Sequence, residues 1–237
     1  MKWFIIVLLF LVATVVILQS FVFDHLETNI EDRNFQYSEE LGWVNWNHAY
    51  PKGTIESYSA LQQLNKSATD SFSFTYSQKM KFKFGNSAVV AEYKECRLIK
   101  PHLTLKEGQE VFMEMFKSVS NSFEKMQGEF PFNVISDSYN SSFREGDLMG
   151  NIISCYCAIS NTQVNEIKNN LTLYDAEKSL EIYERNNLKK IQWEGVMIKS
   201  KKYNKLLCDL QNIIDMSNQK HSSLSRVMSR EDGLYME

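Results

Sequence analysis

The longest apolar run of the chain lies at its N-terminus, where residues 3–23 contain no charged side chain. A helix of about 20 residues spans the hydrocarbon core of a bilayer, whereas the core of a cleavable signal peptide has about 7 to 15 residues. The length therefore predicts a transmembrane signal anchor over residues 1–23, which meets the lipid bilayer through residues 3–23. Ser20 keeps cleavage open as an alternative, and cleavage would release the domain that follows.

The charges on either side of this run indicate its orientation. Lys2 precedes the run, and four acidic residues follow it: Asp24, Glu27, Glu31 and Asp32. Because the basic flanks of membrane helices tend to stay in the cytoplasm, we expect a single-pass protein with a cytoplasmic N-terminus and an extracytoplasmic domain. Residues 24–40 are polar and acidic without a period, so we expect a spacer there.

Strict alternation of residue types marks residues 72–84. The even positions are mainly aromatic, while the odd positions carry Ser, Thr and Lys. A period of two turns one face of a strand toward a core and the other toward water. Gly85-Asn86 then supplies turn residues, and a second apolar run covers residues 89–93. This region predicts an antiparallel β-hairpin.

Helical spacing begins after Pro101. Thr104 and Glu107 match a capping box, and a stripe of Val, Phe and Met residues follows them up to Gly128. This pattern predicts an amphipathic helix whose stripe faces the core.

The remaining elements are expected nearer the C-terminus. Ser142 and Glu145 match a second capping box before an apolar helix. Two more helices are expected near residues 175–186 and 203–214, and a short strand around residues 191–193 separates them.

These elements predict an α+β fold, in which an N-terminal transmembrane helix precedes one domain with an antiparallel β-hairpin packed on several amphipathic helices. We place the domain at residues 41–215, because the chain after the membrane segment is about as long as one hydrophobic core can organise. Residues 216–237 are polar and lack a period, so we expect a disordered tail.

Composition narrows the range of partners. The net charge is −3 over 237 residues, so no basic field exists to attract a nucleic-acid backbone. Apolar residues make up 43% of the chain, which is enough to build a core. We therefore expect a folded domain that binds no nucleic acid.

The densest group of chemically distinctive residues lies in residues 42–53. It contains Trp43, Trp46 and His48 ahead of a Pro-Lys-Gly turn. Histidine exchanges protons near neutral pH, and flanking indoles can wall a ligand pocket or exclude water. Alternatively, both indoles fill the core and His48 only satisfies backbone groups.

A second group, residues 137–151, crowds acids and hydroxyls at a predicted helix N-terminus. Helix initiation alone accounts for Ser142 and for acids such as Asp147, because the helix dipole stabilises negative charge there. Asp147 and Asn151 are four residues apart and share a helix face. They are therefore candidates to orient His48 or a ligand hydroxyl.

The two segments carry the patterns W-x-x-W-x-H-A, from Trp43 to Ala49, and S-S-F-x-x-x-D-L-x-x-N, from Ser141 to Asn151. Together they resemble an uncharacterised group of bacterial cell-envelope proteins. The resemblance covers two short motifs within residues 42–160 and implies no known reaction.

Two functions follow from these residues as hypotheses. The first is a non-enzymatic module that binds an envelope protein or a small ligand, with Trp43, Trp46 and Asn151 as ligand-binding residues. The second is a hydrolase or transferase in which His48 acts as general base, Asp147 orients it and Ser142 or water attacks, as in circularly permuted papain-like hydrolases. Such hydrolases normally use a Cys nucleophile, and Cys155 and Cys157 lie too deep in the predicted helix.

The sequence predicts neither a metal site nor a cofactor, because no diagnostic ligand spacing is present. Four cysteines lack paired CxxC spacing. Cys96 and Cys208 can pair in an oxidising compartment, although all four can equally remain free.

Overall fold

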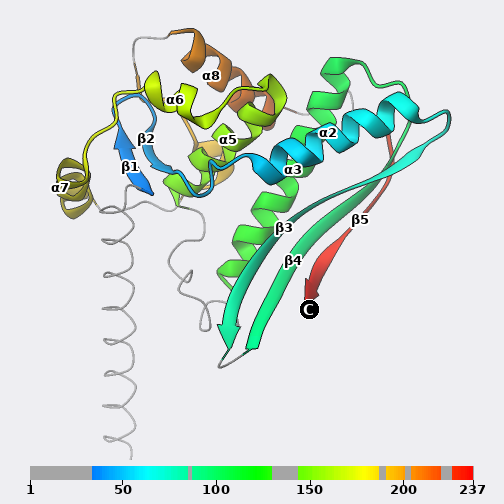
Figure 1. Cartoon of the computed structure of the whole chain (residues 1–237), viewed down its shortest axis with the longest axis horizontal. Coiled ribbons are helices and arrows are strands. Elements are labelled where there is room, and N and C mark those ends of the chain that lie inside the picture. Colours follow the sequence, from blue (N-terminus) through cyan, green and yellow to red (C-terminus); the bar gives the residue numbers. More distant parts are fainter. Residues whose placement is uncertain are drawn as a thin grey trace, which may run out of the picture.

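The computed structural model describes residues 34–84, 87–129, 144–186, 191–200, 204–219 and 226–236. The predicted anchor over residues 1–23 lies outside this part of the chain. Among the described residues, none of the helices combines the length and apolar character needed to span a bilayer. The elements form an α+β fold (Figure 1), and their order is β1 (Phe35–Ser38), β2 (Gly42–Asn45), α2 (Lys52–Ser67), β3 (Phe72–Phe84), β4 (Ser87–Ile99), α3 (Leu105–Gln127), α5 (Glu145–Ser160), α6 (Val164–Asn169), α7 (Ala176–Asn186), the 3₁₀ turn η2 (Trp193–Gly195), α8 (Lys205–Asn218) and β5 (Val227–Met236).

The alternating segment forms strand β3, which pairs antiparallel with β4 along its whole length. Phe72, Phe74 and Tyr76 are buried on one face, whereas Ser73 and Thr75 are exposed on the other. The predicted hairpin is therefore confirmed. Its expected turn, Gly85-Asn86, lies outside the described residues.

The third strand of this sheet was not expected. Residues 216–237 were predicted to form a disordered tail, but α8 continues to Asn218 and Val227–Met236 form β5, which pairs with β4. The prediction was wrong because β5 is polar along much of its length, and it is held by pairing with β4 and by the ion pair of the partly exposed Arg230 with Glu95. Arg230 lies beside the fully buried Glu95, with 3.1 Å between Nη2 and Oε2.

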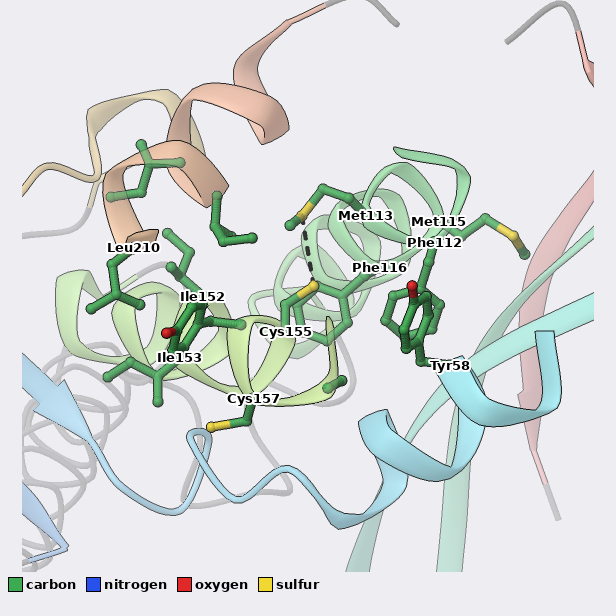
Figure 2. Close-up of a cluster of buried hydrophobic side chains, with 14 of the residues drawn as sticks. Tyr58, Phe112, Met113, Met115, Phe116, Ile152, Ile153, Cys155, Cys157 and Leu210 are labelled. Carbon is green, nitrogen blue, oxygen red and sulfur yellow. Dashed lines mark hydrogen bonds between the residues drawn. The ribbon is translucent and has the colours of Figure 1, made fainter. Parts of the chain in front are cut away.

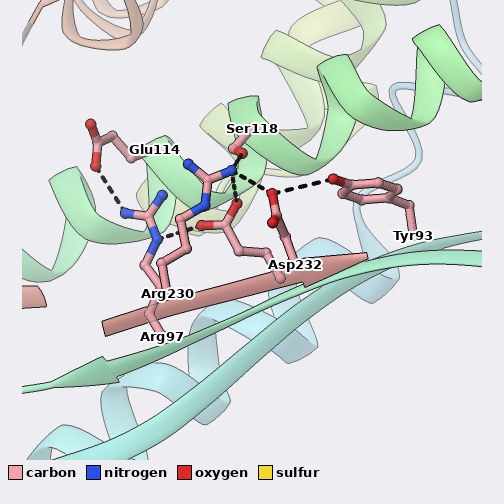
Figure 3. A network of polar contacts seen from close by, with 7 residues as sticks. Tyr93, Arg97, Glu114, Ser118, Arg230 and Asp232 are labelled. Atoms are coloured by element: carbon pink, nitrogen blue, oxygen red, sulfur yellow. Dashed lines mark hydrogen bonds and ion pairs between the residues drawn. The ribbon is translucent and has the colours of Figure 1, made fainter. Parts of the chain in front are cut away.

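A network of charges continues from Glu95 toward α3 (Figure 3). Arg97 donates through Nε to Glu95 and through Nη1 to Glu114 Oε2, the latter at 2.9 Å. Arg230 donates to Ser118 Oγ at 2.9 Å and to Asp232 Oδ2 at 2.8 Å. Arg97 and Arg230 are cross-strand partners, and the carboxylates between them remove the repulsion that like charges would otherwise produce.

Helix α3 confirms the first capping box. Thr104 Oγ1 accepts from the Glu107 N–H, and the Glu107 carboxylate accepts from the Thr104 N–H. The apolar stripe of α3 packs against β3 and β4 on one side, and α3 also contacts α5 and α8 (Figure 1). This helix is the centre of the core.

Helix α5 lies almost wholly inside the protein. Ile152, Ile153 and Cys155 are fully buried, and Figure 2 shows them between α8 and α3. Cys155 Sγ lies 3.7 Å from Met113 Sδ, which fits a thiol that packs as a small apolar group.

The chain before residue 41 belongs to the fold, which corrects part of the predicted spacer. β1 pairs with β2, and Phe35 stacks on Trp43 with 5.1 Å between ring centroids. The sequence pattern of a four-residue strand is too short to be distinguished from that of a polar linker. Its polar residue Gln36 is buried because its side chain hydrogen-bonds with Trp46 and with the Tyr174 carbonyl.

Two elements differ from the sequence prediction. Helix α5 begins at Glu145 with Arg144 at the N-cap position, and Ser142, the predicted cap, lies outside the described residues. The strand expected around residues 191–193 is wrong, because Trp193 lies in a 3₁₀ turn. Helices α7 and α8 confirm the two helices predicted nearby.

Candidate functional site

One face of α5 carries small and polar residues and lies against the turn that follows β2. A Cβ on Gly146 would lie 2.5 Å from the Phe35 ring, and a Cβ on Gly150 would lie 2.4 Å from the Asn45 carbonyl oxygen. Only glycine permits so close an approach at these two positions. The approach brings the turn containing His48 onto the N-terminal half of α5.

This packing places His48 beside Asp147. His48 Nε2 is 3.9 Å from Asp147 Oδ1, and the exposed fractions of the two side chains are 28% and 1%. The separation is longer than a hydrogen bond but within ion-pair reach, and such contacts often tighten when a ligand binds. The geometry is a buried carboxylate behind a half-buried imidazole.

The surroundings of Asp147 favour its neutral form. Burial raises the pKa of the Asp147 carboxyl, and the positive charge of protonated His48 and the hydrogen bond from Asn45 oppose that shift only in part. Asn45 Nδ2 donates to Oδ1 at 2.7 Å, while the buried Oδ2 accepts no hydrogen bond from the described part of the chain. Among these residues, Asp147 is therefore held by one amide.

His48 opens onto a cleft of about 810 Å³. The cleft lies between the turn before α2 and the N-terminal part of α2 on one side, and β3, α3 and α5 on the others. Its volume falls within the range of about 300 to 1,000 Å³ that is usual for small-molecule sites. Its lining is more polar than apolar, which favours a ligand that forms hydrogen bonds.

Several polar side chains of the cleft are fixed by one another. Thr54 Oγ1 and Ser154 Oγ lie 2.8 Å apart and join α2 to α5. Gln78 Nε2 donates to Ser120 Oγ at 2.8 Å. The Gln127 side chain differs from these, because its buried Oε1 accepts no hydrogen bond within the described ranges. The cleft therefore contains a buried acceptor that a ligand can satisfy.

The structure brings together some of the predicted site residues and separates others. His48 and Asn151 both line the cleft, with Asp147 directly behind His48. Trp43 is buried in a small aromatic cluster with Phe35, and Trp46 is buried in the main core, so neither indole lines the cleft. Ser142 lies outside the described residues.

Sequence reasoning missed the contributions of Asn45, Thr54 and Gln127. Asn45 lies within the motif that contains His48, and its proximity to Trp46 was the one available signal. Thr54 and Gln127 come from helices that look like ordinary amphipathic segments. Their roles depend on which elements meet at the cleft.

The cysteines take no part in this cleft, and the structure shows all four as free thiols. Burial raises the pKa of the Cys155 and Cys157 thiols, the second to about 12, so both are poor nucleophiles. Within the described ranges, no cluster of three or more His, Cys, Asp or Glu side chains is arranged to hold a metal ion.

Comparisons of the chain with protein-family models, with curated proteins and with solved structures found no match.

Proposed function

We propose that this protein is a membrane-anchored, extracytoplasmic module that binds a hydrogen-bonding ligand or envelope partner in the cleft beside His48. The observation that carries the proposal is the cleft itself, with a half-buried imidazole on its wall and a buried carboxylate behind it. The membrane location rests on the apolar run over residues 3–23.

Binding fits the site better than catalysis does. A general base needs a nucleophile or a water within about 3 Å, and within the described residues the recorded polar contact of the His48 ring is the one with Asp147. The nearby hydroxyls of Thr54 and Ser154 are hydrogen-bonded to each other. A site that holds polar groups in place without an activated nucleophile suits recognition.

The test is a ligand-observed NMR screen of small polar fragments against the detergent-solubilised full-length chain. Fragments that bind are expected to shift the His48 ring resonances and to bind at least about 10-fold more weakly to His48→Gln, since a buried hydrogen bond to a charged group contributes about 1.5 to 3 kcal/mol. The control is His102→Asn, at an exposed histidine with a positive φ that Asn tolerates. Fragments that leave the His48 resonances unchanged and bind equally well to His48→Gln would refute the proposal.

A second candidate function is hydrolysis with His48 as general base. The 3.9 Å approach of His48 to Asp147 favours it, because a buried carboxylate can orient the imidazole. Hydrolysis of chromogenic esters by the full chain, lost in both His48→Gln and Asp147→Asn, would support this function. Ser142→Ala then distinguishes attack by Ser142 from attack by water.

A further inference from the structure

The cleft runs along a free edge of the sheet. The sheet order is β3-β4-β5, so among the described residues β3 pairs with β4 alone. Seven consecutive β3 residues, Phe74–Met80, line the cleft. Within the described part of the chain, the backbone groups of these residues that point away from β4 have no backbone partner. One wall of the cleft is therefore a row of alternating backbone N–H donors and C=O acceptors.

The same cleft contains a buried acceptor. Gln127 is 8% exposed, and its buried Oε1 accepts no hydrogen bond from the residues that the structure describes. Its Nε2 makes a weak contact with Met80 Sδ, at 3.8 Å. An unsatisfied buried acceptor costs about 1 to 3 kcal/mol, so this amide is suited to receive an N–H or O–H donor from an occupant.

The shape and charge of the cleft restrict what that occupant is. The turn at His48 and helices α2 and α5 line the same cleft as the β3 edge, so the edge forms one wall of a cleft of about 810 Å³. Lys79 pairs with Glu92 at 3.3 Å and the acidic Glu56 also lines the cleft, so the lining has no net positive charge to select an anion. Phe116 and Phe123 of α3 provide an apolar floor.

We propose that the occupant is an extended segment of another polypeptide, which adds to the free edge of β3 as a fourth strand. This rests on the proposed binding function and names its ligand class. Backbone pairing supplies affinity, and alternate side chains of the segment face the apolar floor. Seven strand residues span about 23 Å, which sets the length of the segment.

The test begins with selection of a random display library of peptides of about 12 residues on the full-length chain, long enough to cover the seven strand residues. Hydrogen exchange then follows the Phe74–Met80 amides. Without peptide, the amides that point away from β4 exchange fast. With a selected peptide, they are expected to slow at least about 10-fold, while amides paired with β4 change little.

Two modifications check that the pairing is by backbone. Methylation of a backbone nitrogen of the selected peptide removes its N–H donor. Methylation at alternate residues is expected to abolish binding where those N–H groups face β3, and to leave binding intact where they face away from it. Gln127→Leu is expected to weaken binding about 5-fold, the effect of one hydrogen bond, without unfolding the chain. The control is Gln163→Leu, at an exposed side chain.

Other outcomes overturn the proposal in recognisable ways. Protection of these amides in the unliganded chain would mean that another part of the chain pairs with the edge, and protection that grows with protein concentration would mean that a second copy does. No selected peptide, or peptides that leave the edge unprotected, also refutes it. If small fragments still bind beside His48 in that case, the proposed binding function stands, and if they do not, both fail.

Discussion

The buried position of Asp147 disfavours the ionised form of its carboxyl. Its side chain is 1% exposed, one oxygen has no donor, and burial raises the pKa of the carboxyl. A raised pKa in the folded state means that folding favours the protonated form. The stability that this form contributes is complete below the unfolded pKa and is lost as pH rises through the folded pKa.

Replacement of Asp147 by Asn tests this argument. The lowered pKa values of other carboxyls, such as Glu40 and Glu107, affect both proteins alike, so the informative quantity is the difference in free energy of unfolding between the wild type and Asp147→Asn. This difference should shift in favour of the variant as pH rises from about 4 toward neutrality, by about 1.4 kcal/mol for each unit of the Asp147 pKa shift. The variant should equal or exceed the wild type in stability at neutral pH. Chemical denaturation across this range measures both proteins, and Asp70→Asn, which removes an exposed carboxylate, is the control.

The different burial of the cysteines leads to a second prediction at the scale of single residues. Cys155 and Cys157 are buried with raised thiol pKa values, whereas Cys208 is exposed. A thiol reagent should label Cys208 rapidly in the folded chain and should reach Cys155 and Cys157 only after denaturation. Mass spectrometry of the labelled peptides shows which cysteines react first. Rapid labelling of Cys155 under native conditions would show that the packing around α5 is not as described.

At the scale of elements, the site depends on how closely α5 meets the turn after β2. Gly146 and Gly150 lie one helical turn apart and share a face, so two missing side chains let backbone and ring atoms lie against the helix. Asp147 and Asn151 follow these glycines directly. Consecutive residues lie about 100° apart around a helix, so neighbouring faces of α5 provide the close packing and the polar groups of the site.

Gly150→Ala should disrupt this contact. The new Cβ would lie 2.4 Å from the Asn45 carbonyl oxygen and 2.8 Å from His48 Cβ, so the turn must move. We expect a loss of about 1 to 3 kcal/mol in unfolding free energy and a changed His48 ring environment by NMR.

The matched control for Gly150→Ala is Gly108→Ala in α3, where nothing lies within 4 Å of the new Cβ. Alanine has the higher helix propensity, so this variant should gain up to about 1 kcal/mol. Equal effects of the two substitutions would contradict the proposed role of the close approach.

At the scale of the whole molecule, strand β5 pairs the C-terminal part of the chain with strand β4. Its Arg230 and Asp232 extend the charge network around Glu95 and Arg97, which Figure 3 shows between the sheet and α3. Glu95 is fully buried and Arg97 nearly so. Removing one member of a buried pair leaves an uncompensated charge, whereas replacing both with apolar residues is often neutral.

Arg97→Met should therefore destabilise the fold by about 3 kcal/mol, the lower end of the usual cost, because Arg230 still lies beside Glu95. The double variant Glu95→Leu with Arg97→Met should recover most of that loss, because the buried carboxylate is then absent. Denaturant unfolding measures both, and hydrogen exchange of the β5 amides reports whether the strand detaches. A double variant as unstable as Arg97→Met alone would show that the network has another role.

Much of the fold was accessible from local patterns. The β3–β4 hairpin followed from alternation over residues 72–84, and helix α3 followed from its capping box and apolar stripe. Strand β5 escaped prediction because its sequence is polar and lacks an apolar period, and its place in the sheet depends on pairing with β4 and on the ion pair of Arg230 with Glu95. About half of the candidate site could be predicted from the sequence. His48, Asp147 and Asn151 were singled out, while both tryptophans proved to be core residues.

The sequence by itself determined the elements whose stability depends on neighbours a few residues away, namely the alternating strand and the helix with a capping box. Only the tertiary structure decided that His48 meets Asp147, that Gln127 faces the same cleft, and that, among the described residues, one edge of β3 is unpaired beside them. The physical reason is that periodicity and capping act within a turn or a strand. Contacts between distant segments depend instead on how whole elements pack, and at this site on two glycines that let a turn lie against a helix.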